Sequence, residues 1–258
     1  MKKRVRRFSS LTDDFYNGGE GYSLPEDYKW VRTDWVSRAL SAVIYGVALV
    51  VAVVYCRLFL HVRIKGAEKL KVAKGTGCFV YGNHTQPVGD VFIPALACFP
   101  KRIYTVVSPA NMTLPVIGKI LPYLGALPLP DSLSGMRQFT SAVEHRLEQN
   151  KCVVIYPEAH VWDYCTFIRP FTDAPFKYPV KFGKPVFCMT ATYQKRRLGS
   201  RPLATVYIDG PFEADADRSE RQRAVQLRDS VCDCMTERSR LSNCRYIEYI
   251  DCSGQDEN

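Results

Sequence analysis

The stretch GNHTQPVGD, residues 82–90, places a histidine and an aspartate in a turn-rich segment with five residues between them. A histidine can take up or release a proton near neutral pH because its ordinary pKa is about 6.5. An aspartate bonded to the ring would fix its tautomer and stabilise the charged imidazolium. A structural alternative has His84 bonding the backbone of its loop and Asp90 capping the apolar helix that follows. Taken alone, the stretch favours this structural alternative.

A second polar segment, PEAH at residues 157–160, changes that balance. It follows the apolar run CVVIY, just as His84 follows the apolar run CFVY. In open α/β sheets, functional residues gather in the loops beyond the carboxyl ends of the strands. With Glu158 placed after a second strand, we interpret His84 as a base held by Asp90, which can also cap its helix.

The neighbouring polar residues have more than one interpretation. Glu158 is either a site residue that orients a substrate or organises its loop, or a strand-end carboxylate paired with an arginine. His160 is either a second polar group of the site or part of an aromatic cluster with Trp162 and Tyr164. Asn83 is expected to shape the turn before the histidine.

Short apolar runs alternate with helical stretches after residue 60. The runs at 78–81, 102–107, 152–156, 185–191 and 204–208 predict strands, and helices are expected after Asp90, over 133–149 and over 218–241. Continuous apolar strands separated by helices predict an α/β fold, with a mixed, mostly parallel central sheet flanked by helices. In the last helix Ala224, Leu227, Val231 and Cys234 recur at helical spacing, which predicts a core-facing stripe.

Residues 39–56, ALSAVIYGVALVVAVVYC, contain no charged side chain. At about 1.5 Å per residue, this run nearly matches the roughly 30 Å hydrocarbon core of a bilayer. It is apolar on every face, which favours a membrane-embedded helix over a buried core helix. Basic residues stand on both sides of it, so the positive-inside rule does not choose an orientation, and a spanning helix and a re-entrant anchor both stay open. We expect a tail at 1–34, a membrane anchor at 35–60, a globular domain at 61–250 and a tail at 251–258.

Charge and cysteine content limit the classes of partner. The net charge of +9 favours anionic partners, and no nucleic-acid motif accompanies it, so we expect a membrane surface and a phosphate-bearing substrate rather than nucleic acid. Ten cysteines without a CxxC pair, several inside apolar runs, indicate a reducing compartment. The cysteines near the C-terminus match no familiar zinc spacing, so no metal site is expected.

The two polar loops together resemble the motifs of the glycerolipid acyltransferases, the family of 1-acylglycerol-3-phosphate acyltransferase. The first motif of that family is Asn-His, a short spacer and Asp, which Asn83, His84 and Asp90 resemble. Tyr156-Pro157-Glu158 stands where the family has Phe-Pro-Glu. Residues 111–130 and 184–186 resemble the second and fourth motif regions, so the likeness covers roughly residues 62–210.

The chain departs from the family pattern in three places. The spacer between His84 and Asp90 has five residues instead of four, and Pro87 and Gly89 could let the loop bulge and return the aspartate. The arginine that ends the second motif is missing near Pro130. Ala159-His160-Val161 replaces the Gly-Thr-Arg of the third motif. Arg137, Arg169 and Lys177 are candidate substitutes for these cations at an acceptor phosphate, and none of them lies in a matching motif.

The resemblance implies transfer of a fatty acyl group from acyl-CoA or acyl-carrier protein to the hydroxyl of a lysophospholipid. The default acceptor is 1-acylglycerol-3-phosphate, which would give phosphatidic acid, and no cofactor is needed. His84 and Asp90 are then the catalytic pair, and the expected substrate-binding residues are Glu158, Asn83, His160, Arg169 and Arg137. The acyltransferase domain is expected at a bilayer, on its cytoplasmic face. The alternatives are a membrane-associated esterase or thioesterase, and a lipid-binding membrane protein without catalysis.

Overall fold

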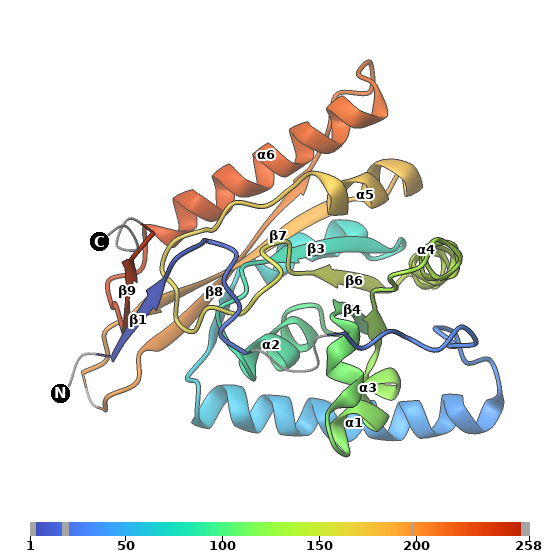
Figure 1. The fold of residues 1–258 in the computed structure, drawn as a ribbon, viewed down its shortest axis with the longest axis horizontal. Helices are drawn as coiled ribbons and strands as arrows, with labels where there is room; N and C mark the ends of the chain where they lie inside the picture. The colour runs from blue at the N-terminus through green and yellow to red at the C-terminus, as the bar shows by residue number, and fades with distance from the viewer. Residues whose placement is uncertain (1–3, 17–20, 198, 254–258) are drawn as a thin grey trace.

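A central β-sheet organises the protein (Figure 1). The computed structural model describes residues 4–16, 21–197 and 199–253. Within these residues, seven strands form one sheet in the order β2-β8-β7-β3-β6-β4-β5. Their bounds are β2 Arg63–Lys65, β3 Cys78–Gly82, β4 Ile103–Val107, β5 Ala126–Pro128, β6 Cys152–Ile155, β7 Val186–Gln194 and β8 Leu203–Phe212. The β7–β8 pair is antiparallel and the other pairs are parallel, which confirms the predicted mixed, mostly parallel sheet.

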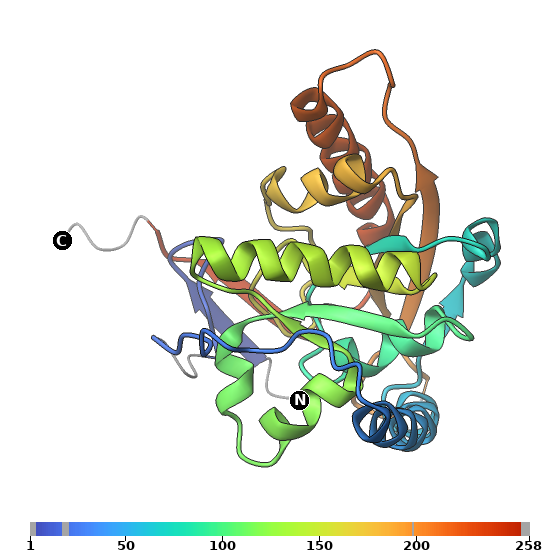
Figure 2. The same ribbon diagram turned by 90° about the vertical axis from the view of Figure 1, so that its right-hand side faces the viewer.

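Helices cover both faces of this sheet. They are α1 Trp35–Leu58, α2 Gly89–Ala97, α3 Ile117–Leu124, α4 Leu133–Glu148, α5 Lys177–Phe182 and α6 Glu220–Ser239, with short 3-10 helices at Ala67–Ala73, Pro109–Thr113 and Ala174–Phe176. Figure 2 shows α4 and α1 on opposite sides of β4. In β3, Phe79 and Tyr81 join the core formed with α4 and α6, while Cys78 and Val80 join the core formed with α1 and α2. Because successive side chains point to opposite faces, a strand covered on both sides reads as one continuous apolar run.

The expected helices are present with small differences at their ends. α4 and α6 lie within the predicted ranges 133–149 and 218–241. Helix α6 begins at a capping box, in which Ser219 and Gln222 exchange side-chain and backbone hydrogen bonds. Of its predicted core stripe, Ala224, Leu227 and Val231 are buried, but Cys234 is only partly buried, and the neighbouring Met235 takes the inward position.

The segment that we expected to be an N-terminal tail packs onto the domain where it is described. Strand β1, Arg4–Phe8, pairs in parallel with β9, Ile247–Asp251, near the C-terminus. Trp30 is buried, and its indole Nε1 donates to the carbonyl of Pro128 at 2.9 Å. Residues 1–3, 17–20 and 254–258 of the two expected tails lie outside the described residues, and the domain boundaries stay a prediction.

Helix α1 lies along one side of the domain. Asp34 caps its first turn by accepting from the backbone N–H of Ser37. One side of the helix packs against α2 and α3, where the Ser41 hydroxyl donates to Tyr123 O at 2.7 Å and Cys56 is buried. The other side leaves valines such as Val43, Val47 and Val50 exposed. In the described part of the chain, α1 alone is long and apolar enough to cross a membrane, with a mean hydropathy of 2.4.

Candidate active site

His84 and Asp90 are in direct contact. The ring Nδ1 of His84 lies 2.8 Å from Oδ2 of Asp90, whose side chain is 4% exposed against 20% for the histidine. The five-residue spacer closes through a helical turn. The Asp90 N–H donates to Gln86 O, and the Gln86 N–H donates back to the Asp90 carboxylate, both at 2.9 Å. The turn absorbs the additional residue and returns the aspartate to the ring.

Gly89 contributes to this turn in a different way than we expected. Its φ angle is outside the left-handed region, so the freedom of glycine in backbone angles is not what the loop uses. A Cβ atom at Gly89 would lie 2.9 Å from Gln86 Cβ and 2.9 Å from Leu60 Cδ1, closer than real contacts allow. Because Gly89 has no side chain, the loop can pack closely against Leu60, which lies shortly after the end of α1.

Asp90 is not the N-cap residue of α2. Val88 occupies that position without a side-chain cap bond, and Asp90 lies in the first turn of the helix. A carboxylate there is still favoured by the positive end of the helix dipole. Asp90 thus serves the histidine and the start of the helix, but it does so from inside the first turn.

Tyr156 touches both members of the pair. Its ring stacks on the His84 ring, with centroids 4.3 Å apart and an interplanar angle of 17°. Its hydroxyl donates to the backbone carbonyl of Asp90 at 2.7 Å. Burial raises the pKa of Tyr156, so the phenol keeps its proton and stays a donor. A Cβ at Gly82 would lie 2.7 Å from this ring, so glycine at the end of β3 makes room for it.

Glu158 and Arg169 form a buried ion pair behind the histidine. Each side chain is 1% exposed, and Arg169 Nη2 lies 3.0 Å from Glu158 Oε2. The same carboxylate accepts from the backbone N–H of His84 at 3.2 Å and from that of Arg169 at 3.0 Å. Burial raises the pKa of Glu158, and the adjacent guanidinium opposes that shift. Glu158 therefore both pairs with an arginine and organises the loop, two roles that we had treated as alternatives.

Arg169 does not face the space beside His84. Its guanidinium lies between Glu158 and the face of Trp162, with Cζ 4.8 Å from the ring centroid. A buried carboxylate needs a charged partner, and Arg169 supplies it. The expectation that Arg169 presents a cation to an acceptor phosphate does not fit this position.

Asn83 fixes the start of the loop. Its amide donates to the carbonyl of Ala191 at 3.1 Å, and its Oδ1 accepts from the Ala191 N–H at 2.8 Å. This two-point bond ties the end of β3 to β7, and Asn83 is buried. The structure thus gives Asn83 the turn-shaping position that we expected, facing β7.

The other two expected substrate-binding residues, His160 and Arg137, make no contact with His84 or Asp90 in the described part of the chain. His160 is half-buried, and its Nδ1 lies 3.3 Å from Oδ2 of Asp14. Arg137 lies on the exposed part of α4, and no contact joins it to His84 or Asp90 in the described part of the chain. The structure therefore does not bring Arg137 to the pair.

Tyr193 is a site-forming residue that the sequence reasoning missed. It is fully buried on β7, where its hydroxyl lies 2.6 Å from Thr85 Oγ1 and 3.1 Å from Gln86 Nε2. These contacts hold the first residues of the spacer. Tyr193 lies just beyond the strand that we predicted to end at residue 191, and a polar aromatic side chain at a strand end was the available signal.

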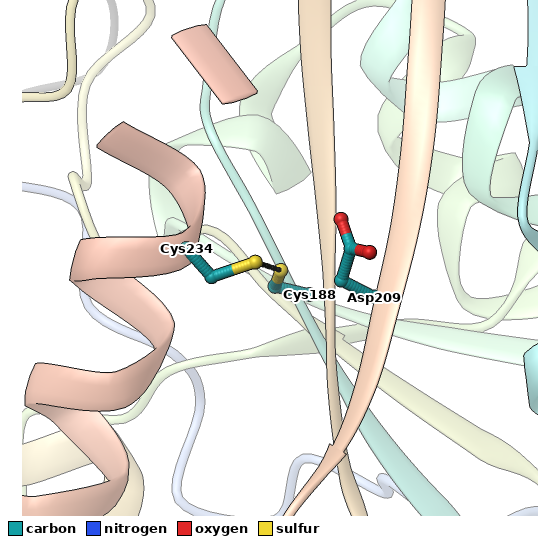
Figure 3. Close-up of side chains that lie close together, drawn as sticks. All are labelled: Cys188, Asp209 and Cys234. Atoms are coloured by element: carbon teal, nitrogen blue, oxygen red, sulfur yellow. Dashed lines mark hydrogen bonds between the residues drawn. The ribbon is translucent and has the colours of Figure 1, made fainter. Parts of the chain in front are cut away.

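Cys188, Asp209 and Cys234 form a second group of chemically capable side chains (Figure 3). The two sulfur atoms lie 3.7 Å apart. Asp209 Oδ2 accepts from Arg238 Nε at 2.7 Å, and Oδ1 accepts from Arg238 Nη2 and Lys69 Nζ. These cations, Arg238 first, lower the pKa of Asp209 to about 2. Because both oxygens are already engaged, we assign the carboxylate to an ion-pair network that joins α6 and β8, and the absence of a metal site stays a prediction.

The pair of His84 and Asp90 has the geometry of a general base. With Nδ1 bonded to the carboxylate, Nε2 is the ring atom left to accept a proton, and no partner for it is found in the described residues. A base of this kind can activate a hydroxyl, and the carboxylate would stabilise the imidazolium that forms.

Comparisons with known proteins agree with the motifs. The family model described as Acyltransferase matches residues 61–192, just over half of the chain, and this range includes both loops. A crystal structure of the 1-acyl-sn-glycerophosphate acyltransferase PlsC from Thermotoga maritima has a similar fold, with a TM-score of 0.57 and 16% sequence identity. The match covers 82% of this chain and 83% of that chain. Among curated proteins, no sequence match was found. The sequence resemblance is thereby confirmed: the chain belongs to the acyltransferase family.

Proposed function

We propose that this protein transfers a fatty acyl group from acyl-CoA or acyl-carrier protein to the hydroxyl of a lysophospholipid. The observation that carries the proposal is the 2.8 Å contact between His84 Nδ1 and Asp90 Oδ2, on a histidine that is still partly exposed. In a chain of the acyltransferase family, a partly exposed base of this kind suits activation of an acceptor hydroxyl.

The reaction needs no nucleophile from the protein. His84 Nε2 takes the proton of the acceptor hydroxyl while the oxygen attacks the thioester carbonyl. Asp90 stabilises the imidazolium during this step. The tetrahedral intermediate collapses with loss of the thiolate, which recovers the proton from His84. The new ester and a free thiol are the products.

The default acceptor is 1-acylglycerol-3-phosphate. The structurally similar Thermotoga maritima protein is described as a 1-acyl-sn-glycerophosphate acyltransferase, and the motifs resemble that family. The side chain of Arg169 is buried against Glu158, so it gives this acceptor no direct support. The head group is therefore the part of the proposal that a panel of acceptors must decide.

The position of α1 supports a protein that lies on one leaflet of a bilayer. Residues before the helix, such as Arg4–Phe8 and Trp30, pack on the same domain as the residues that follow it. A helix crossing the bilayer would place these two parts on opposite sides of the membrane. We therefore propose that α1 lies in the membrane plane with its exposed valines in the hydrocarbon, and that the domain is on the cytoplasmic side, where free cysteines stay reduced.

The candidate site lies beside the C-terminal end of α1. A Cβ atom at Gly89 would lie 2.9 Å from Leu60 Cδ1, so the start of α2 packs closely on Leu60. Tyr55 of α1 packs against Phe92 of α2, with ring centroids 5.8 Å apart. Exposed apolar side chains stand on both segments: Leu58, Phe59, Val88 and Val91. We propose that the acyl chains of a membrane-borne substrate contact this apolar rim, because burial of apolar surface there is favourable.

The decisive experiment supplies labelled acyl thioester and a panel of lysophospholipids in vesicles to wild type and to His84→Ala. We expect labelled diacyl lipid with the wild type, and a loss of about 10²–10⁴-fold in the variant. Equal acylation by both proteins would contradict the role of His84. Labelled free fatty acid without any acceptor would instead identify an esterase or thioesterase, and binding without turnover would identify a lipid-binding protein.

A further inference from the structure

The backbone of His84 is held by the loop that follows β6. Glu158 accepts from the His84 N–H, and the Trp162 N–H donates to the His84 carbonyl at 3.0 Å. The next bond joins the Tyr164 N–H to Thr85 O at 2.8 Å. The position of the histidine therefore depends on the position of residues 158–164.

This loop also depends on contacts with other parts of the chain. It has no regular secondary structure, and Ala159 and Tyr164 have φ angles of 65° and 54°, in a region that non-glycine residues adopt at an energetic cost. Trp162 is nevertheless fully buried. Such a conformation persists when surrounding structure fixes it.

Part of the surrounding structure is the N-terminal arm, which we define as residues 4–16. Phe8 and Phe15 cover Trp162, with ring centroids 4.9 and 5.2 Å from its own. The indole Nε1 of Trp162 donates to the carbonyl of Asp13 at 2.9 Å. Tyr249 of β9 also stacks on Trp162, with centroids 4.8 Å apart.

Asp163 gives the arm a second, charged attachment. Arg6 Nη2 lies 2.6 Å from its Oδ2, and the Tyr16 hydroxyl donates to its Oδ1 at 2.6 Å. The Asp163 carbonyl accepts from the Tyr249 hydroxyl at 2.9 Å. The arm and β9 thus meet at Trp162 and Asp163, and the N–H of Trp162 is the donor to the His84 carbonyl.

The arm depends on the loop in return. Strands β1 and β9 form a sheet of only two strands, and such a pair is at most marginally stable in water by itself. Its stability comes from the aromatic cluster around Trp162. The arm lies outside residues 61–192, the range that the acyltransferase family model matches.

We propose that the N-terminal arm and β9 form a clasp that positions His84 through Trp162 and Asp163. Arg6 and Phe15 are then positioning residues for the reaction, although they act through the loop and do not touch the substrate. This inference rests on the proposed role of His84 as base. It assigns a function to a segment whose sequence predicted only a tail.

The test uses the full-length protein with Arg6→Ala and Phe15→Ala. Their matched controls are Arg7→Ala, which removes the same charge from an exposed position of β1, and Leu11→Ala, which removes an exposed apolar side chain from the same arm. The first readout is hydrogen–deuterium exchange of peptides covering 82–90 and 158–167. We expect faster exchange in both peptides for the two variants, unchanged exchange in α6, and wild-type exchange in the controls.

The second readout is steady-state acyl transfer. Because small displacements of a reacting group are costly, we expect kcat to fall about 10-fold or more with KM nearly unchanged, and Arg6→Lys to recover most of the loss. Unchanged exchange at 82–90, or an unchanged kcat in both variants, would overturn the clasp. If the proposed function is wrong, His84→Ala has wild-type activity. The hydrogen–deuterium exchange data do not depend on activity, so they test the clasp separately.

Discussion

The hydroxyl of Tyr156 donates to the backbone carbonyl of Asp90 at 2.7 Å, while the Tyr156 ring stacks on His84. These three residues come from the two segments that follow the neighbouring parallel strands β3 and β6, and Asp90 lies in the first turn of α2. A tyrosine here thus fixes the turn that returns Asp90 to the histidine, a task that the ring of a phenylalanine could perform only in part.

Tyr156→Phe tests this relationship. The variant keeps the stacked ring and loses one buried hydrogen bond, so we expect the free energy of unfolding to fall by about 0.5–1.5 kcal/mol. We also expect a several-fold lower kcat, because Asp90 loses a constraint. Urea unfolding and acyl-transfer rates measure the two effects, with Tyr178→Phe on α5 as control. A wild-type kcat in Tyr156→Phe would show that the ring alone suffices.

Asp90→Asn tests the role of the carboxylate. Gln86 N–H and His84 Nδ1 both bond Oδ2 of Asp90, so an asparagine that keeps its oxygen there can still accept from both, but it has no negative charge to stabilise the imidazolium. We expect kcat to fall on the order of 10²–10⁴-fold with the fold intact. Asp229→Asn on α6 is the control, and equal rates in both variants would rule out this role.

The buried pair of Glu158 and Arg169 predicts non-additive stability effects. Arg169→Met leaves an uncompensated buried carboxylate, so we expect a loss of about 3–5 kcal/mol in the free energy of unfolding. Adding Glu158→Gln removes that charge and should recover part of the loss. Chemical denaturation of the two single variants and the double variant measures the coupling. Strictly additive losses would mean that the two charges do not interact.

Asp209 predicts a stability change in acid. Its folded-state pKa is lowered from 3.8 to about 2 by Arg238 and Lys69, so the folded protein favours the ionised form. This contribution is complete above pH 4 and is lost as the pH falls from about 4 to 2. Asp209→Asn should therefore be less stable than wild type at neutral pH, and the difference should shrink over that window. Thermal unfolding measured between pH 7 and 2 checks the convergence, and a constant difference would contradict it.

The proposed in-plane position of α1 predicts a one-sided effect on membrane binding. Val47→Asp places a charge on the exposed side of the helix, away from its contacts with α2 and α3, and should weaken binding to anionic vesicles by about tenfold or more. Leu133→Asp, at an exposed apolar residue on α4 across the sheet, should leave binding unchanged. Vesicle co-sedimentation compares the two, and equal binding by both variants would argue against α1 as the contact.

The sequence alone determined the features that depend on local pattern. The apolar runs of the strands, the periodicity of α4 and α6, the length of α1 and the order of the motifs are all properties of nearby residues, so they could be predicted without a fold. The pairing of His84 with Asp90 was already a plausible prediction, because the two residues are close in the chain.

The tertiary structure alone decided the features that join distant residues. It placed Arg169 against Glu158, brought Tyr156 onto His84 and Tyr193 onto the spacer, and packed part of an expected tail onto Trp162. Residues 4–8 have no helical or alternating pattern that would predict a strand. Their partners lie on β9 and on the loop after β6, far away in the sequence, so their pairing could not be predicted. Contacts of this kind are fixed by packing between elements, and a single sequence does not state which elements will meet.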